Sequence, residues 1–190
     1  MLVGFHGYGE DAAAQLQRMR RIPGAERWQL VSIQGLHRFY QRRTNDVVAS
    51  WMTRQDRELA IGDNLAYVAA VIEAVTRNES PATRLVFTGF SQGVAMAFRA
   101  AASAPGADGV IAVGGDIPPE LAPADLMRVR HALVCHGARD PWYAPAMCER
   151  DVQRLRQANV DVRPLQFDGG HEWHDDVAQG ASLFLHERLS

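Results

Sequence analysis

The stretch from Leu85 to Gly93 constrains the fold of this chain more than any other. Its first four residues, Leu85 to Thr88, are apolar or β-branched, which is typical of a buried strand. The next five read Gly-Phe-Ser-Gln-Gly, and the G-x-S-x-G pattern is typical of a sharp turn from a strand into a helix. An alanine-rich run from Val94 to Ala104 follows, and such small side chains let a helix lie close to a sheet. The stretch therefore predicts a strand, a tight turn and a helix, with Ser91 at the turn as a candidate nucleophile.

Ser91 is expected to have a strained backbone at the N-terminus of that helix. The glycines two residues before it and two after it remove Cβ atoms that would collide across the turn. Free backbone N–H groups at a helix N-terminus favour negative charge that develops beside them. The same five-residue pattern also occurs by chance as a purely structural turn, so its meaning depends on partner residues elsewhere in the chain.

Length and composition indicate one compact domain spanning residues 1–190, with 47% apolar residues to form its core. The chain has 20 basic and 22 acidic residues, a balance that argues against nucleic acid as the main partner. Cys135 and Cys148 make neither a disulfide framework nor a zinc site, so we expect a reducing compartment and a cytoplasmic location. We see no signal peptide and no apolar run of membrane-spanning length, and we expect no stable membrane association.

Strands are expected to alternate with helices along the chain. We predict strands at Leu2 to Phe5, Leu30 to Ile33, Arg84 to Thr88, Gly109 to Val113, Ala132 to Cys135 and Val160 to Phe167. We predict helices at Asp11 to Arg21, Arg57 to Arg77, Val94 to Ala104, Ala124 to Val129, Ala144 to Asn159 and Glu172 to Leu189. This alternation predicts an α/β fold whose mostly parallel sheet of about six strands has helices on both faces.

Two further segments carry specific expectations. The segment from Gln34 to Asn45 is rich in arginine and aromatic residues, and we predict that it is irregular. In the helix from Arg57 to Arg77, apolar residues recur at helical spacing and mark the expected buried face: Leu59, Leu65, Val68, Ile72 and Val75.

A serine hydroxyl is a poor nucleophile at neutral pH, so Ser91 needs a nearby base, and that base needs an orienting carboxylate. Asp140 follows the fifth predicted strand and His171 the sixth, so both would lie at the same edge of the sheet as Ser91. Asp116 and His174 are the alternatives. We favour Asp140 because it lies beside the strand that the order Ser, Asp, His predicts, and His171 because it lies on a glycine-flanked loop.

Acyl transfer also requires N–H donors for the negative charge on the carbonyl oxygen, worth about 3–4 kcal/mol each. The backbone N–H of Gln92, next after the nucleophile, is one candidate donor. The second should come from the loop after the first strand, where Tyr8 stands between two glycines. His6 in the same loop is expected to be structural.

Two other chemistries are disfavoured. The run from His171 to His174 is one residue short of the H-E-x-x-H zinc motif, so its two histidines do not share a helical face. Cys135 lies within a predicted strand and is expected in the core, not as a nucleophile. We therefore expect neither a metal nor another cofactor.

With these stretches in place, the sequence resembles the phospholipase/carboxylesterase family of α/β-hydrolases, which includes bacterial carboxylesterases and acyl-protein thioesterases. The matching stretches are Phe5 to Gly9, Gly89 to Gly93, His136 to Asp140 and Gly170-His171, with Ser50-Trp51 resembling a tryptophan found before the long helix. The resemblance covers almost the whole chain. It implies Ser91 as nucleophile, His171 as base, Asp140 as its partner, and the N–H groups of Tyr8 and Gln92 as oxyanion donors.

The sequence departs from that family at three places. No β-hairpin precedes the first strand, so the sheet is expected to be smaller at one edge. The connection between Trp51 and the long helix is short, where relatives build a wall of an acyl channel. Trp142, two residues after the acid, is expected either to narrow the pocket or to join the core. The residues expected to line an apolar acyl site are Leu36, Phe39, Tyr40, Trp51 and Met52.

The sequence therefore predicts a cytoplasmic serine esterase that cleaves a small ester or thioester through an acyl-enzyme. A peptidase or a lactonase on the same triad remains open, because fold and triad do not set the substrate. A catalytically silent binding protein that keeps the pocket is the alternative from another class. The oligomeric state does not follow from the sequence.

Overall fold

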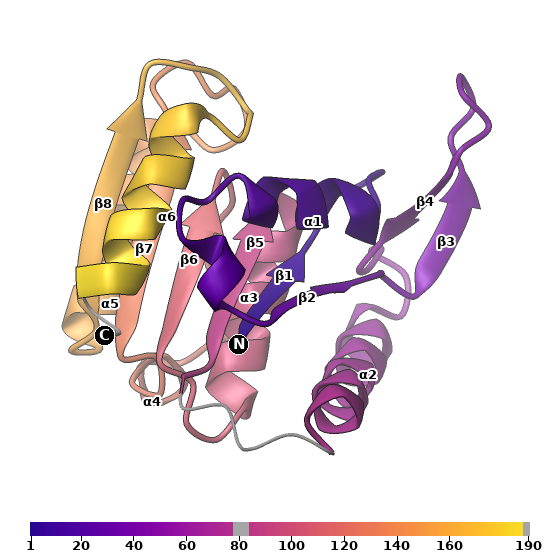
Figure 1. Ribbon diagram of the computed structural model, residues 1–190, viewed down its shortest axis with the longest axis horizontal. Coiled ribbons are helices and arrows are strands. Elements are labelled where there is room, and N and C mark those ends of the chain that lie inside the picture. The colour runs from indigo at the N-terminus through magenta and orange to yellow at the C-terminus, as the bar shows by residue number, and fades with distance from the viewer. Residues whose placement is uncertain (78–83, 188–190) are drawn as a thin grey trace.

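A computed structural model describes residues 1–77 and 84–187. Six of its strands are β1 (Leu2–Phe5), β2 (Leu30–Ile33), β5 (Val86–Phe90), β6 (Gly109–Val113), β7 (His131–Gly137) and β8 (Asp161–Phe167). They form one sheet in the order β2-β1-β5-β6-β7-β8, and every neighbouring pair is parallel (Figure 1). This architecture confirms the predicted α/β fold with a six-stranded parallel sheet.

Burial explains why these strands read as continuous apolar runs. Every residue of β1, β5 and β6 is buried, because a central parallel strand is covered on both faces. The two edge strands, β2 and β8, are only partly buried. Pro164 lies in β8, where a missing N–H is tolerated because an edge strand has a neighbour on one side only.

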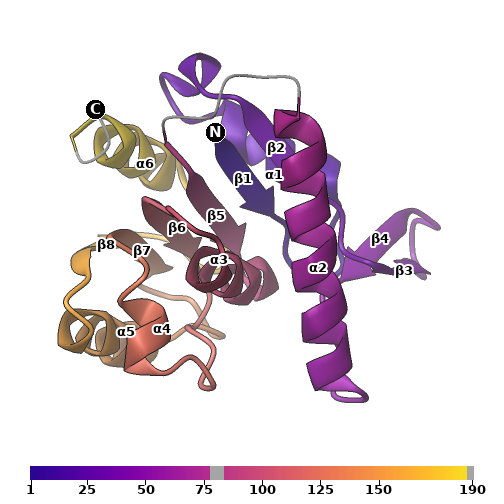
Figure 2. The ribbon, with the colours of Figure 1, turned by 90° about the horizontal axis from the view of Figure 1, so that it is seen from below.

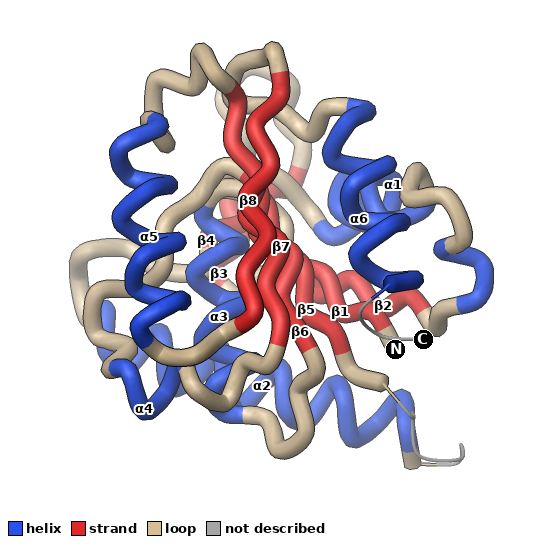
Figure 3. The backbone as a smooth tube through the Cα atoms, turned by 90° about the vertical axis from the view of Figure 1, so that its left-hand side faces the viewer, coloured by secondary structure: helices blue, strands red, loops and turns tan. Residues whose placement is uncertain are grey.

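Helices cover both faces of the sheet. Those described are α1 (Ala12–Arg20), α2 (Arg57–Thr76), α3 (Gln92–Ser103), α4 (Pro123–Leu126), α5 (Pro145–Gln157) and α6 (Asp175–Glu187), with a short 3₁₀ helix at Ala25–Arg27. α1 and α6 lie on one face, and α3, α4 and α5 lie on the other (Figures 1 and 3). The last predicted helix begins three residues late, at Asp175, and its predicted end at Leu189 lies outside the described residues.

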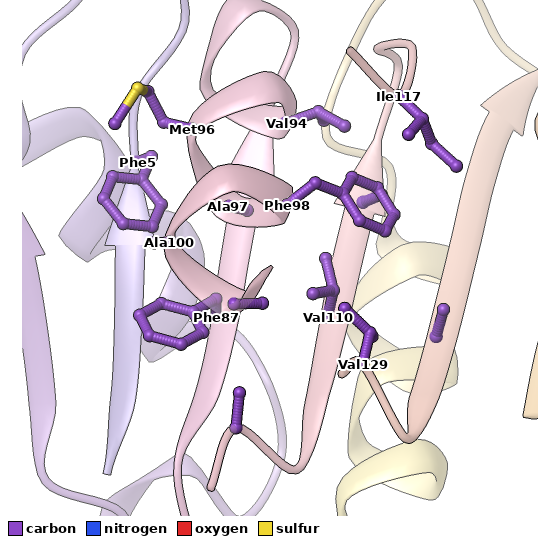
Figure 4. Packing of buried hydrophobic residues seen from close by; sticks show 14 of the residues in the cluster. Phe5, Phe87, Val94, Met96, Ala97, Phe98, Ala100, Val110, Ile117 and Val129 are labelled. Carbon is purple, nitrogen blue, oxygen red and sulfur yellow. The ribbon is translucent and has the colours of Figure 1, made fainter. Parts of the chain in front are cut away.

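The larger of the two core clusters lies under α3. Val94, Ala97 and Phe98 of this helix point to the sheet, against Phe87 of β5 and Val110 of β6 (Figure 4). All of these side chains are fully buried. The alanine-rich sequence of α3 thus places the helix directly on the strand that precedes it, which holds the turn between them in a defined position.

The prediction of an irregular segment from Gln34 to Asn45 is wrong for part of its length. β3 (His37–Tyr40) pairs in antiparallel fashion with β4 (Val47–Ser50), and the hairpin projects from the side of the molecule beyond β2 (Figure 1). Three of the four β3 residues are exposed. A strand such as β3, with little burial on either face, needs no alternation of apolar and polar residues, so its sequence carries no strand period.

The helix predicted from Arg57 is confirmed as α2, but its buried face is only partly the expected one. Leu59 is 70% exposed, and the buried residues are Ala60, Asn64 and Val68. Asn64 Nδ2 donates to the carbonyl of Trp51 at 2.6 Å. Because its amide has this partner, a polar residue can lie on the buried face of α2. The remaining predicted core positions, Leu65, Ile72 and Val75, are partly buried against the core.

Length and composition alone would allow α2 to cross a membrane, contrary to the expectation from the sequence. A core helix of a globular protein can satisfy the same two criteria. In this structure Val68 belongs to the larger core cluster, and Leu65 and Ile72 pack against it. Figure 2 shows α2 lying along the side of the sheet next to α3.

Candidate active site

Ser91 lies in the tight turn between β5 and α3, at the carboxyl end of the sheet. Its φ of 52° and ψ of −120° lie in a region that non-glycine residues rarely adopt. The backbone N–H of Ser91 donates to Val113 O at 2.9 Å and ties the turn to β6. A Cβ atom on Gly89 would overlap Gly93 O, and one on Gly93 would overlap Phe5 O. The two glycines are therefore required by close backbone approach.

A carboxylate and a histidine from the loops after β7 and β8 form a hydrogen-bonded pair. Asp140 Oδ2 lies 2.8 Å from His171 Nδ1. Asp140 Oδ1 accepts from the backbone N–H groups of Trp142 at 2.8 Å and Tyr143 at 3.0 Å. The Asp140 side chain is only 1% exposed, so these bonds orient it in a nearly dry environment. With Nδ1 as the donor to Asp140, His171 Nε2 is left as the basic nitrogen.

The alternative acid and base are not part of this hydrogen-bonded pair. Asp116 is exposed, and the histidine of the pair is bonded to Asp140. His174 accepts a hydrogen bond from the N–H of Asp176 at 3.2 Å and stacks on Phe167, at the start of α6. The structure therefore brings Ser91, Asp140 and His171 to one edge of the sheet, with Ser91 and His171 lining the same cavity.

The turn that contains Asp140 is anchored to α5 through a buried carboxylate. Tyr143 OH donates to Asp151 Oδ2 at 3.2 Å, and the N–H of Ile117 donates to the same oxygen at 3.0 Å. Burial raises the pKa of Asp151, and the bond from Ile117 opposes that rise. Arg154 of α5 donates to the carbonyls of Ile117 and Pro118, each at 3.0 Å. One hydrogen-bond network thus holds both the turn that contains Asp140 and the loop after β6.

The backbone N–H groups of Tyr8 and Gln92 are available as donors. Within residues 1–77 and 84–187, neither of these amides donates to another group of the protein. The loop around Tyr8 is held on both sides, because Gly7 N donates to Glu10 Oε2 at 2.8 Å and Gly9 N donates to Ala49 O at 2.9 Å. Free backbone donors, such as Tyr8 on this held loop and Gln92 at the start of α3, are one requirement of an oxyanion hole.

A partly buried ion pair that the sequence analysis missed fixes this loop. The two carboxylate oxygens of Glu10 accept from Arg18 of α1, each at 2.6 Å. Burial raises the pKa of Glu10, but the hydrogen bonds from Arg18 and Gly7 and the positive charge of Arg18 together outweigh burial and hold that pKa below its usual value. The Arg18 guanidinium also lies 4.1 Å from the centre of the Phe90 ring, and that ring contacts His171 at 5.0 Å. The pair therefore links the loop that contains Tyr8 to the neighbourhood of His171.

His6 has the structural environment that was expected for it. Its Nδ1 donates to Gly7 O at 2.7 Å, and its Nε2 accepts from Gly35 N at 3.0 Å. Burial lowers the pKa of His6, so the ring is neutral at physiological pH. Both ring nitrogens are occupied, which leaves none for proton transfer from Ser91.

The side chain of Gln92 has a second task that its motif did not indicate. Its Oε1 accepts from the N–H of Trp51 at 2.9 Å, and its Nε2 donates to Met52 O at 3.2 Å. The residue after Ser91 therefore ties the segment that follows β4 to the start of α3. No sequence signal other than the chemistry of an amide, which can donate and accept at once, points to this role.

A cavity of about 290 Å³ opens beside Ser91. Trp142 and Met52 line it, and the Trp142 ring, 74% exposed, stacks on His171 with centroids 5.7 Å apart. Trp142 thus belongs to the cavity and not to the core. Arg57 and Arg99 also line this cavity, and the sequence analysis assigned them no role.

Other residues expected to line the acyl site lie elsewhere. Trp51 is fully buried, packs edge-on against Phe5 at 5.3 Å and donates from Nε1 to His6 O at 2.8 Å. Trp51 is therefore a core residue and does not line the cavity. Leu36, 38% exposed, and the hairpin residues Phe39 and Tyr40 are also absent from its wall. Phe39 packs against the ring of Tyr8 at 5.6 Å instead.

In residues 1–77 and 84–187, the geometry supports neither a metal site nor a reactive thiolate. Among the described residues there is no group of three or more His, Cys, Asp or Glu side chains arranged to hold a metal ion. Burial raises the pKa of Cys148 to about 11, and burial also raises that of Cys135 above its usual value. Both cysteines are buried thiols, and Cys135 packs in the core.

A profile of phospholipase/carboxylesterase sequences matches residues 1–188. The chain belongs to this family. Among solved structures, the carboxylesterase from Mesorhizobium loti superposes with a TM-score of 0.79 at 21% identity, over 97% of this chain and 87% of that one. The Bacillus cereus carboxylesterase gives 0.79 at 16% identity, over 100% and 88% of the two chains. Acyl-protein thioesterase 2 from Zea mays gives 0.76 at 17% identity, over 100% and 93%.

These likenesses confirm the α/β-hydrolase fold of this member of the phospholipase/carboxylesterase family. No curated protein sequence matches the chain significantly. At such low identities the superposed structures support the fold alone, and the chemistry of the family member described here has to be argued from its own site.

Proposed function

We propose that this protein is a serine esterase that hydrolyses small carboxylic esters or thioesters through an acyl-enzyme. The observation that carries the proposal is the hydrogen-bonded Asp140–His171 pair beside the same cavity as Ser91, the residue held in the strained turn. A nucleophile, a base and an orienting carboxylate are the minimum set for covalent acyl transfer.

In the proposed reaction, Ser91 Oγ attacks the carbonyl carbon while His171 Nε2 takes the hydroxyl proton. Asp140 stabilises the imidazolium that forms, and the N–H groups of Tyr8 and Gln92 bind the developing oxyanion. His171 then gives its proton to the leaving alcohol or thiol, and the acyl group stays on Ser91. A water molecule, deprotonated by His171, attacks the acyl-enzyme and releases the acid.

The size of the cavity supports a small substrate. Its volume of about 290 Å³ lies at the lower end of ligand pockets, and Trp142 narrows it beside His171. We therefore infer a short or medium acyl chain. The free, buried cysteines are compatible with a reducing compartment, and we propose the cytoplasm as the location.

Hydrolysis of a p-nitrophenyl ester series from acetate to decanoate tests the proposal directly. Ser91→Ala should lower kcat by roughly 10⁴-fold to 10⁶-fold, by analogy with other serine hydrolases. Ser103→Ala, the same substitution at the far end of α3, is the matched control and should retain the activity. A fluorophosphonate probe should label wild type and Ser103→Ala but not Ser91→Ala.

The other outcomes distinguish the alternatives. Labelling of Ser91 without hydrolysis of any ester in the series would exclude simple acyl esters and favour a peptidase or a lactonase. If the probe does not label the protein and no ester is hydrolysed, the enzyme proposal is contradicted. That result would favour a binding protein that retains the pocket.

A further inference from the structure

Two arginines in the candidate active-site cavity have no part in the proposed ester hydrolysis. Arg99 extends from α3, and Arg57 is the first residue of α2. Both line the cavity that contains Ser91. The Arg99 side chain is only 3% exposed, and a charged side chain is seldom buried to that degree without a full set of partners.

The two guanidinium groups share a single carboxylate. Arg99 Nε and Nη2 donate to Glu120 Oε1 at 2.9 and 2.6 Å. Arg57 Nη2 donates to Glu120 Oε2 at 3.1 Å. Because Glu120 balances only one of the two positive charges, the cluster of Arg57, Arg99 and Glu120 carries one excess positive charge.

One N–H group of the buried arginine lacks a strong acceptor. In the part of the chain that the structure describes, the hydrogen-bonding contact of Arg99 Nη1 is the thioether sulfur of Met52, 3.7 Å away. A thioether is a weak acceptor, and a buried charged donor without a good acceptor is costly. Met52 and Arg99 both line the cavity, so this contact is made between two of its wall residues.

We propose that the ester substrate of this protein carries a carboxylate, which accepts hydrogen bonds from Arg99 and Arg57 in the cavity. The proposal rests on the proposed esterase function and names the substrate class for it. A carboxylate has the planar, paired oxygens that guanidinium groups bind well. Asp116 also lines the cavity and offsets the excess charge, but it is exposed to solvent. The preference for a carboxylate-bearing ester therefore depends more on hydrogen bonds from the N–H groups of Arg99 and Arg57 than on the net charge of the cavity.

The test compares charged and uncharged esters of matched length. The charged series comprises mono-4-nitrophenyl half-esters of succinic, glutaric and adipic acids, and the uncharged series comprises the 4-nitrophenyl esters of the straight-chain monoacids with the same number of carbons. The readout is the ratio of kcat/KM for the charged ester to that for the uncharged ester. Rates with Ser91→Ala are subtracted, because the free carboxylate of a half-ester assists its uncatalysed hydrolysis.

We expect wild type to prefer at least one half-ester. Arg99→Gln should lower the ratio by roughly 10-fold to 100-fold, as expected for loss of a hydrogen bond between charged groups. Arg57→Gln should lower it less, because the Arg57 side chain is 38% exposed. Arg163→Gln is the matched control, since Arg163 pairs with Glu187 at the same 3.1 Å on the distant β8–α6 side and should leave the ratio unchanged.

Glu120→Gln gives a result of opposite sign. Removing the shared carboxylate frees donors of both arginines, so the ratio should rise above that of wild type. A merely structural ion pair predicts instead that both esters are hydrolysed more slowly by the same factor, with the ratio unchanged. This variant also keeps the proposal testable if circular dichroism shows that Arg99→Gln does not fold.

The outcomes separate this proposal from the esterase proposal. Suppose that the uncharged esters are hydrolysed only when Ser91 is present, and that the ratio of charged to uncharged kcat/KM is the same in every variant. This result would overturn the carboxylate site but leave the esterase proposal intact. If neither series is hydrolysed, titration calorimetry with glutarate decides. Binding to wild type that is at least tenfold weaker in Arg99→Gln would support the site, and no binding to wild type would overturn it.

Discussion

The two sides of the candidate active site are held in different ways. We call the loops after β5, β7 and β8 the catalytic side, and the β3–β4 hairpin together with α2 the peripheral side. On the catalytic side, Ser91 and Asp140 are fixed by hydrogen bonds to backbone groups and by close contact between glycines and neighbouring chain. On the peripheral side, the amide side chains of Gln92 and Asn64 make the connections.

Burial follows the same division. β5 is buried at every residue, whereas three of the four residues of β3 are exposed and α2 has only three buried residues. Figure 2 shows α2 and the hairpin to one side of the sheet. A strand and a helix that are packed on both faces can hold the positions of reacting groups to within a fraction of an ångström. A partly exposed cavity wall, in contrast, tolerates substitutions with little loss of stability. We infer that chemistry belongs to the first side, and that the second side contributes to substrate selection through Arg57.

After loss of Ser91 itself, the largest effect should come from the acid on the catalytic side. Asp140→Asn should lower kcat by roughly 10³-fold to 10⁴-fold, because an amide cannot hold His171 in the required tautomer or stabilise its imidazolium. Asp116→Asn, an exposed acid of the same cavity, is the matched control and should change kcat less than tenfold. Steady-state hydrolysis of a short p-nitrophenyl ester measures both. Similar losses in the two variants would refute the assignment of Asp140.

Glycines in two helices sharpen the comparison at the level of stability. Gly93→Ala should lower the free energy of unfolding by about 3 kcal/mol or more, because a Cβ there would overlap Phe5 O. Gly62→Ala, in the middle of α2, should raise it by about 0.5–1 kcal/mol, because a Cβ there meets no atom within 4 Å and alanine favours the helix. Urea denaturation measures both changes. Equal effects would show that the elbow and α2 are packed alike.

A smaller effect should appear in the pH dependence of stability. Burial lowers the pKa of His136 in β7, opposed by the nearby Asp140 carboxylate. Below about pH 6.5 the unfolded chain therefore binds a proton that the folded protein does not, and the free energy of unfolding falls as the pH falls. His136→Phe should remove up to about 1.4 kcal/mol per pH unit of that slope, down to the folded-state pKa.

Urea denaturation of wild type and His136→Phe between pH 5 and pH 7.5 measures this difference in slope. His37→Phe, at an exposed position of β3, is the control for loss of one imidazole from the peripheral side. Parallel stability curves for wild type and His136→Phe would contradict the prediction.

The sequence predicted the catalytic side better than the peripheral side, and burial explains why. A central parallel strand must be apolar on both faces, and the turn after β5 leaves room for no Cβ at Gly89 or Gly93. Such constraints are local, so they appear in the sequence as a run and a motif. The order of Ser91, Asp140 and His171 along the chain then placed three side chains at one edge of the sheet.

The peripheral side lacks comparable local constraints. β3 has no buried face to impose a period of two, and α2 is apolar around most of its circumference, so spacing alone selected Leu59 where the structure buries Asn64. The partners of Arg99 and Gln92 come from distant segments, at Glu120 and at residues 50–52. Contacts of this kind depend on the assembled fold and leave no pattern in neighbouring residues.

The network through Asp151 has a consequence for redesigning this protein. Tyr143 holds Asp140 through its backbone and Asp151 through its phenol, and Asp151 in turn holds Ile117 in the loop that forms part of the cavity wall. Libraries aimed at the Pro118–Pro119 wall would therefore disturb the acid together with the substrate. Libraries of substitutions at Met52 and Arg57 would change the substrates that fit the cavity without disturbing Ser91, Asp140 or His171. The peripheral side is therefore the better starting point for directed evolution.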